Sequence, residues 1–119
     1  MITKGIRGAI TVENNVVESI EAATVELLEQ MIDDNNIEKH SISHVIFTLT
    51  QDLDAGFPAK FARGRLGWDE VAMMCFNELN VPKSLEKCLR VLIVLNCEEE
   101  FVPKHSYLKG AKVLRPEFG

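Results

Sequence analysis

Hydrophobic and polar positions alternate along several short stretches of the chain and recur at helical spacing along others. Alternation predicts a strand, because successive side chains on a strand point to opposite faces, whereas a repeat near 3.6 residues predicts a helix. A long amphipathic helix is expected up to about Asn35, with Asn14 or Asn15 as its cap, and a short helix is expected from Pro58. The expected strands are 4–12, 44–50, 71–79, 88–97 and 107–115.

The order of these elements indicates an α+β fold. Strands interrupted by only two helices favour a mixed sheet of about five strands, with the long and the short helix mostly on one face. A chain of 119 residues is the size of one domain, so we expect a single domain over 1–119. The other sheet face would be left without cover, which favours self-association.

The strand 88–97 holds an arginine, Arg90, among aliphatic residues. Its neighbours on the strand point to the opposite face, namely Leu89, Val91, Ile93 and Leu95. A guanidinium keeps its charge, so an arginine held here needs an anionic partner. Taken alone, this stretch allows two interpretations: an arginine that reaches water or a structural carboxylate, or an arginine that faces a pocket for an anion.

Further cations occupy positions that could converge with Arg90. Arg7 lies between two glycines in the first strand, and the others lie on the short helix or at a strand end: Lys60, Arg63 and Arg115. A solvated basic surface is the simpler explanation for the helical pair. Converging, however, these cations would form a positive pocket for a small dicarboxylate in a protein of net charge −5. Glu78 would be the counter-charge, and its carboxylate would accept a hydrogen bond from a substrate hydroxyl. Fixed charges of this kind can catalyse without a nucleophile.

Composition and motifs exclude several other classes of protein. The net negative charge argues against nucleic-acid binding, and no apolar run approaches the roughly 20 residues of a membrane span. The first residues lack the apolar core of a signal peptide, so a cytoplasmic protein is expected. Cys75, Cys88 and Cys97 form no C-x-x-C pattern and are expected to be buried free thiols. No motif for a metal, a nucleotide or a covalent nucleophile is present, so neither a metal nor a cofactor is expected.

The residues in unusual places belong to a pattern that resembles one family. It comprises Gly5-Ile6-Arg7-Gly8-Ala9, Thr11-Val12, Phe57-Pro58-Ala59-Lys60, Arg63, Gly67-Trp68, Cys75, Glu78, Lys87-Cys88-Leu89-Arg90-Val91, Tyr107-Leu108 and Val113-Leu114-Arg115-Pro116. In order and spacing this pattern resembles the small monofunctional chorismate mutases of the trimeric α/β class. The resemblance covers nearly the whole chain.

The resemblance implies a homotrimeric pseudo-α/β barrel with active sites at subunit interfaces. It also implies the [3,3] Claisen rearrangement of chorismate to prephenate, a step of phenylalanine and tyrosine biosynthesis that uses no cofactor. Because the reaction is unimolecular, such an enzyme selects the reactive conformer and stabilises charge in the transition state.

The resemblance also implies roles for matching residues. Arg90 would donate to the ether oxygen, Glu78 with the Cys75 region would bind the ring hydroxyl, and Arg7 with Tyr107 would hold the side-chain carboxylate. The ring would be enclosed by Phe57, Ala59, Met73, Met74 and Leu114. Lys60, Arg63 and Arg115 would attract the dianion near the entrance.

Strand geometry complicates these assignments at two places. Cys75 and Glu78 are three residues apart and face opposite ways on a regular strand, so either the strand bends or the two residues serve one ligand from different chains. Tyr107 and Arg115 would be separated by roughly 27 Å on an extended strand, too far for one small pocket.

The sequence also departs from the family pattern. Smaller or hydroxyl-bearing residues are usual at Met73-Met74, and a longer tail than the one ending at Gly119 often helps to close the site, so weaker closure is expected. Two alternatives to the mutase stay open: a non-catalytic trimeric module that binds a small anion, and an imine deaminase of similar architecture.

Overall fold

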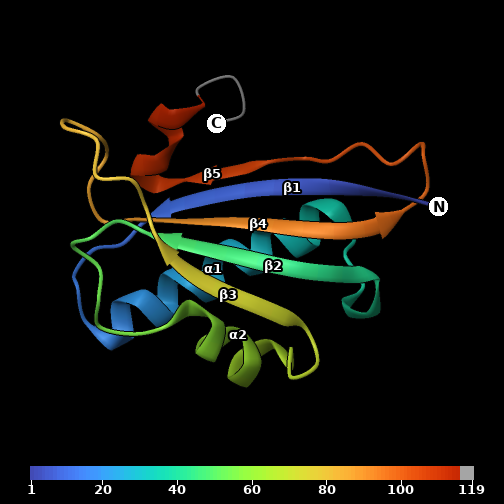
Figure 1. The fold of residues 1–119 in the computed structure, drawn as a ribbon, viewed down its shortest axis with the longest axis horizontal. Helices are drawn as coiled ribbons and strands as arrows, with labels where there is room; N and C mark the ends of the chain where they lie inside the picture. Colours follow the sequence, from blue (N-terminus) through green and yellow to red (C-terminus); the bar gives the residue numbers. More distant parts are fainter. Residues whose placement is uncertain (116–119) are drawn as a thin grey trace.

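The computed structural model describes residues 1–115, and within them five strands form one sheet whose two α-helices lie on a single face (Figure 1). The predicted α+β class and the number of strands are confirmed. The elements are β1 (Ile2–Thr11), α1 (Val17–Asn35), the 3₁₀ helix η1 (Lys39–Ser41), β2 (Ile42–Leu49), α2 (Pro58–Leu66), β3 (Ala72–Asn77), β4 (Cys88–Cys97), β5 (Ser106–Leu108) and the 3₁₀ helix η2 (Lys109–Leu114).

The strand order in the sheet is β3-β2-β4-β1-β5, which places β4 in the middle. β4 pairs antiparallel with both β1 and β2, whereas the outer pairs β2–β3 and β1–β5 are parallel, so the sheet is mixed. The bounds of β4 coincide with the predicted strand 88–97. The backbone of β4 is therefore hydrogen-bonded to a strand on each side, which fixes the position of its side chains.

The core lies between the sheet and the helices. The aliphatic side chains of β4 that were predicted to share one face are buried there against α1 and α2. Gly8 of β1 lets α1 approach, because a Cβ at this position would collide with the Sδ atom of Met31. The opposite face of the sheet carries Arg90 and the half-buried Leu92 and Val94 of β4, and we call it the open face.

The predicted last strand, 107–115, is wrong beyond Leu108. β5 is only three residues long, and Lys109 then adopts a left-handed φ of 52°, which ends the extended conformation. The next residues form η2, where the backbone N–H of Gly110 donates to the hydroxyl of Thr11 at 3.0 Å. η2 folds over the open face and packs Ala111 against a small second cluster. The expected stop at Pro116 and the tail to Gly119 lie outside the described residues.

The predicted cap of the long helix is also wrong. The N-cap residue of α1 is Val16, and no side chain caps the helix. Asn15 bonds instead to the loop after β2: its amide donates to the carboxylate of Asp54 at 2.7 Å, and its oxygen accepts from the backbone N–H groups of Asp54 and Ala55. The asparagine therefore fixes that loop against the start of α1.

Candidate active site

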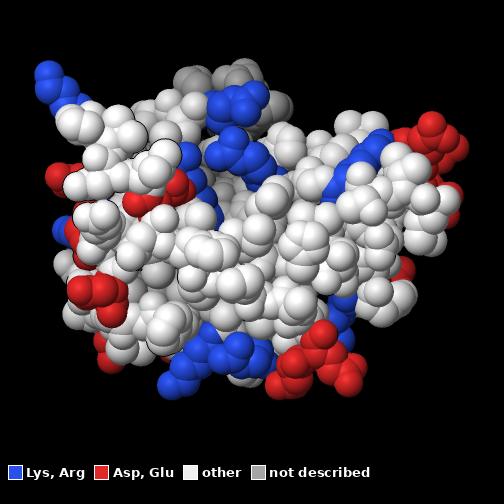
Figure 2. Space-filling view, in the orientation of Figure 1, with Lys and Arg blue, Asp and Glu red and all other residues white. Residues whose placement is uncertain are grey.

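A cavity of about 250 Å³ opens on the open face of the sheet. It lies where β1, β2 and β4 are neighbours, because Thr48 pairs directly with Arg90 and Arg7 pairs with Leu92. Figure 2 shows this face as largely uncharged, with basic side chains around a hollow near its upper centre. The residues that line the cavity are Arg7, Ile46, Thr48, Glu78, Arg90, Val91 and Leu92.

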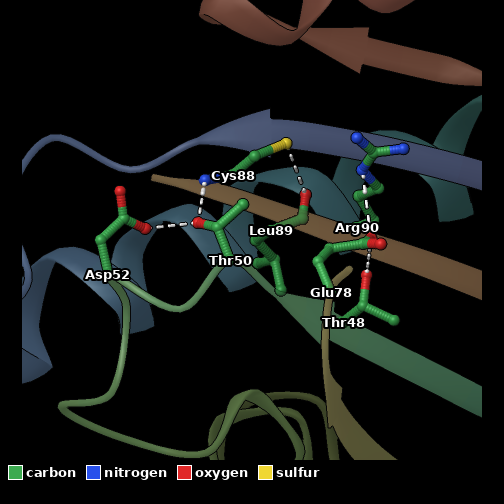
Figure 3. Close-up of polar contacts among 7 residues, drawn as sticks. All are labelled: Thr48, Thr50, Asp52, Glu78, Cys88, Leu89 and Arg90. Carbon is green, nitrogen blue, oxygen red and sulfur yellow. Dashed lines mark hydrogen bonds and ion pairs between the residues drawn. The ribbon is translucent and has the colours of Figure 1, made fainter. Parts of the chain in front are cut away.

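Arg90 and Glu78 form an ion pair inside this cavity (Figure 3). The Nε atom of Arg90 lies 3.2 Å from Oε2 of Glu78, and the hydroxyl of Thr48 donates to the same oxygen at 2.5 Å. The side chain of Arg90 is 28% exposed and that of Glu78 is 23% exposed. The two interpretations of Arg90 are therefore not exclusive, since this arginine reaches a carboxylate and also faces a cavity.

Glu78 lies just beyond the end of β3, not inside a strand as predicted. β3 ends at Asn77, and the backbone N–H of Glu78 then donates to the carbonyl of Leu49 at 2.8 Å. The carboxylate thereby reaches the open face, where Thr48 and Arg90 meet it.

The start of β4, two residues before Arg90, is held by side chains of the loop after β2. The backbone N–H of Cys88 donates to the hydroxyl of Thr50 at 3.0 Å, and that hydroxyl donates to Asp52. Asp52 also accepts from the backbone N–H of Lys87, which adopts a left-handed φ of 46°. Cys88 is buried, and this burial raises the pKa of its thiol. The expected burial of Cys75 and Cys97 is wrong, because both are only half-buried.

A second cavity, of about 510 Å³, lies at the edge formed by α2 and β3. Phe57, Lys60 and Cys75 line it, and Phe57 is 69% exposed. Cys75 points toward α2, and burial raises the pKa of its thiol. Glu78 lines the first cavity instead, so the two residues face different cavities as expected, although Glu78 does so from beyond the strand.

The other residues expected to surround a substrate ring fall into different environments. Ala59 is buried in the core, and Met73 packs against it from the helix side of the sheet. Met74 lies on the open face and is 61% exposed. Arg63 is exposed on α2. The structure thus separates Met73 from Met74 within one chain.

The C-terminal candidates gather beside the first cavity. Tyr107 is buried with Ala9, Cys88 and Ala111, and Leu114 packs against the same cluster. The predicted separation of Tyr107 from Arg115 by roughly 27 Å does not apply, because a 3₁₀ helix advances only about 2 Å per residue.

A histidine links this group to the first cavity. His105 accepts a hydrogen bond at Nδ1 from the backbone N–H of Arg7 at 2.9 Å. Burial, and then the charges of Arg115 and Arg7, lower the pKa of His105. Arg7 and Arg115 are therefore both near this ring, although the sequence placed them in different strands.

Sequence reasoning missed two residues of this region, Thr48 and His105. Thr48 lies in a correctly predicted strand, but its position opposite Arg90 depends on a pairing register that the alternation does not specify. His105 precedes β5, and only the parallel pairing of β5 with β1 brings it to Arg7.

The fold and the first cavity define a class: small α+β proteins with two arginines and a glutamate in a cavity on one sheet face. The family model for chorismate mutase type I matches residues 3–118, and the chain belongs to this family. The resemblance found in the sequence is thereby confirmed. None of the helices in residues 1–115 is long and apolar enough to cross a membrane.

Individual relatives agree with this assignment. The chain is 38% identical over 121 residues to the chorismate mutase AroH of Bacillus subtilis (strain 168), which covers 98% of this chain and 93% of that protein. It is 42% identical over 118 residues to AroH of Thermus thermophilus, with coverage of 98% and 96%. The solved structure of a chorismate mutase from Clostridium thermocellum is similar at a TM-score of 0.88 and 49% identity, over 92% of this chain and 98% of that one.

Proposed function

We propose that this chain, as a single mutase domain, catalyses the rearrangement of chorismate to prephenate, an isomerisation in aromatic amino-acid biosynthesis. The observation that carries the proposal is the Arg90–Glu78 pair in the cavity on the open face. In this reaction one C–O bond breaks as one C–C bond forms within the same molecule, so no proton or nucleophile has to be supplied. Fixed charges that match the transition state are sufficient.

Arg90 supplies hydrogen-bond donors to the breaking bond. Its Nε atom is ion-paired with Glu78, whereas the terminal nitrogens of the guanidinium lie on the side away from Glu78 (Figure 3). These terminal N–H groups donate to the ether oxygen as negative charge develops there, and to a substrate carboxylate. A donor of this kind contributes about 10²–10³ in kcat.

Glu78 and Arg7 orient the substrate. Glu78 accepts a hydrogen bond from the ring hydroxyl, and Arg7 holds the side-chain carboxylate beside the group that contains Tyr107 and Arg115. Holding both ends of the molecule favours the compact conformer in which the reacting carbons are close.

The complete active site forms between two copies of the chain in a homotrimer. Two observations support this proposal: Cys75 and Lys60 line a different cavity from Arg90, and the edge strand β3 exposes apolar side chains. An exposed apolar edge strand favours pairing with another chain. Leu114 would add to the enclosure from the chain that supplies Arg90. A neighbouring copy would bring its α2 and β3 to the Arg90 cavity and add the remaining candidates, which are Phe57, Ala59, Lys60, Arg63, Met73, Met74 and Cys75.

The test is the loss of chorismate absorbance with purified protein, compared with the Arg90→Ala variant. We expect turnover by the wild type and a loss of at least about 100-fold in the variant. No turnover above the uncatalysed rate by the wild type would refute the proposed activity. Sedimentation of the wild type tests the interface, and a stable monomer at assay concentrations would refute the shared site.

A further inference from the structure

The hydroxyl of Thr48 makes its hydrogen bond to the same carboxylate oxygen that faces Arg90. Oε2 of Glu78 accepts from Thr48 and pairs with Nε of Arg90 at 3.2 Å (Figure 3). We propose that Thr48 is a positioning residue that holds Glu78 in this one-oxygen contact with Arg90. The inference rests on the proposed function, because it explains how Glu78 and Arg90 stay available to the substrate.

An arginine and a carboxylate left to themselves tend to form a bidentate pair, with two parallel N–H···O bonds. Such a pair between Arg90 and Glu78 would occupy a terminal nitrogen of the guanidinium and both oxygens of the carboxylate. The Thr48 hydroxyl opposes this arrangement, because rotating the carboxylate toward the terminal nitrogens would break the bond from Thr48. Held by Thr48, Glu78 keeps Oε1 to accept the substrate hydroxyl, and Arg90 keeps its terminal N–H groups for the ether oxygen.

The sheet fixes Thr48 in the place where this contact is possible. Thr48 and Arg90 are directly opposite each other in the antiparallel β2–β4 pair, which brings their Cβ atoms to about 5 Å. Glu78 is anchored one residue along β2, through its backbone hydrogen bond to Leu49. A β-branched threonine has few χ1 rotamers, so its hydroxyl stays directed at the carboxylate.

The first experiment compares two substitutions at this position. Thr48→Val keeps the shape of the side chain and removes the hydroxyl, and we expect kcat/KM for chorismate to fall by about 10- to 100-fold, the range for a lost bond to a charged group. Thr48→Ser keeps the hydroxyl and should remain within about threefold of the wild type. The matched control is Thr24→Val, which removes a buried hydroxyl that donates to the carbonyl of Ile20 in α1, away from the cavity.

The second experiment repeats Thr48→Val in a Glu78→Ala background. If Thr48 acts through Glu78, the further loss should be less than about twofold, because the group that Thr48 positions is already absent. A loss as large as in the wild-type background would show a general structural effect and overturn the inference. The inference is also overturned if Thr48→Val alone stays within threefold of a fully active wild type, or if Thr48→Ser is as impaired as Thr48→Val.

The same measurements separate this inference from the proposed function. A wild type that does not convert chorismate refutes the function, and the positioning role falls with it. A wild type that converts chorismate normally, with an unimpaired Thr48→Val variant, refutes the positioning role alone.

Discussion

Replacing Arg90 by lysine keeps the positive charge and removes the planar fork of donors. In the structure the Nε group of Arg90 is already paired with Glu78 at 3.2 Å, and the side chain is only 28% exposed. A lysine ammonium is a single point charge, so it can pair with Glu78 or approach the ether oxygen, but it cannot hold both in the same geometry. We expect Arg90→Lys to lose the donation to the breaking bond, which corresponds to about 3–4 kcal/mol of transition-state stabilisation, or roughly 100- to 1000-fold in kcat.

The assay is the initial rate of chorismate loss at saturating and subsaturating substrate, with urea unfolding to verify the fold. The matched control is Arg65→Lys on α2, where an exposed guanidinium pairs with Glu21 at 3.0 Å. Its kcat should stay within about twofold of the wild type, because an exposed ion pair contributes little. If Arg90→Lys kept more than a tenth of wild-type kcat, the planar fork of Arg90 would not be the source of catalysis.

Three further predictions concern the scaffold around the cavity. Gly8→Ala should lower the free energy of unfolding by about 1–2 kcal/mol in urea titrations, because the new Cβ would collide with the buried Met31. Asp52→Ala should lower it by about 1 kcal/mol and reduce kcat, because the backbone at the start of β4 loses its acceptor. The pKa of His105 is lowered in the folded protein, so the unfolded chain takes up a proton at a higher pH than the folded chain does. The free energy of unfolding should therefore fall as the pH drops through about 6.5, and His105→Gln should remove this part of the loss.

Controls and contradicting outcomes test the reasoning behind these predictions. Gly64→Ala is the control for the glycine variant, since a Cβ there meets nothing within 4 Å, and equal effects of the two would disprove the close-packing argument. Asp69→Ala removes an exposed carboxylate elsewhere and should leave both stability and kcat unchanged. For His105, an unchanged pH dependence of unfolding in the glutamine variant would show that another group carries it.

The sequence predicted β4 and the core well because alternation reports burial directly. Aliphatic residues on one face of 88–97 could only be buried against helices, and the structure buries them there. The prediction failed for 107–115, where apolar residues recur but do not alternate strictly. The left-handed φ of Lys109 and the hydrogen bond from Gly110 to Thr11 convert that segment to η2, and neither leaves a periodic signal in the sequence.

The pattern of hydrophobic and polar residues predicted the fold better than it predicted which residues form the candidate site. The resemblance named Arg7, Glu78 and Arg90, but their meeting in one cavity depends on the strand register and on the end of β3. Thr48 carried no signal of its own, because a threonine in a strand is ordinary. Its contact with Glu78 follows only when β2, β3 and β4 are assembled.

Both interpretations of Arg90 that the sequence left open apply in the structure, where the side chain pairs with a carboxylate and also faces a cavity. A half-buried guanidinium with no anion would destabilise the free protein, and a guanidinium fully engaged by a carboxylate would be unable to serve a substrate. The contact of Nε with one oxygen of Glu78 satisfies the first requirement, and the hydrogen bond from Thr48 to that oxygen satisfies the second. Arg90 is thus ion-paired at its inner nitrogen while its outer nitrogens point away from Glu78, which is the arrangement that preorganised electrostatic catalysis requires.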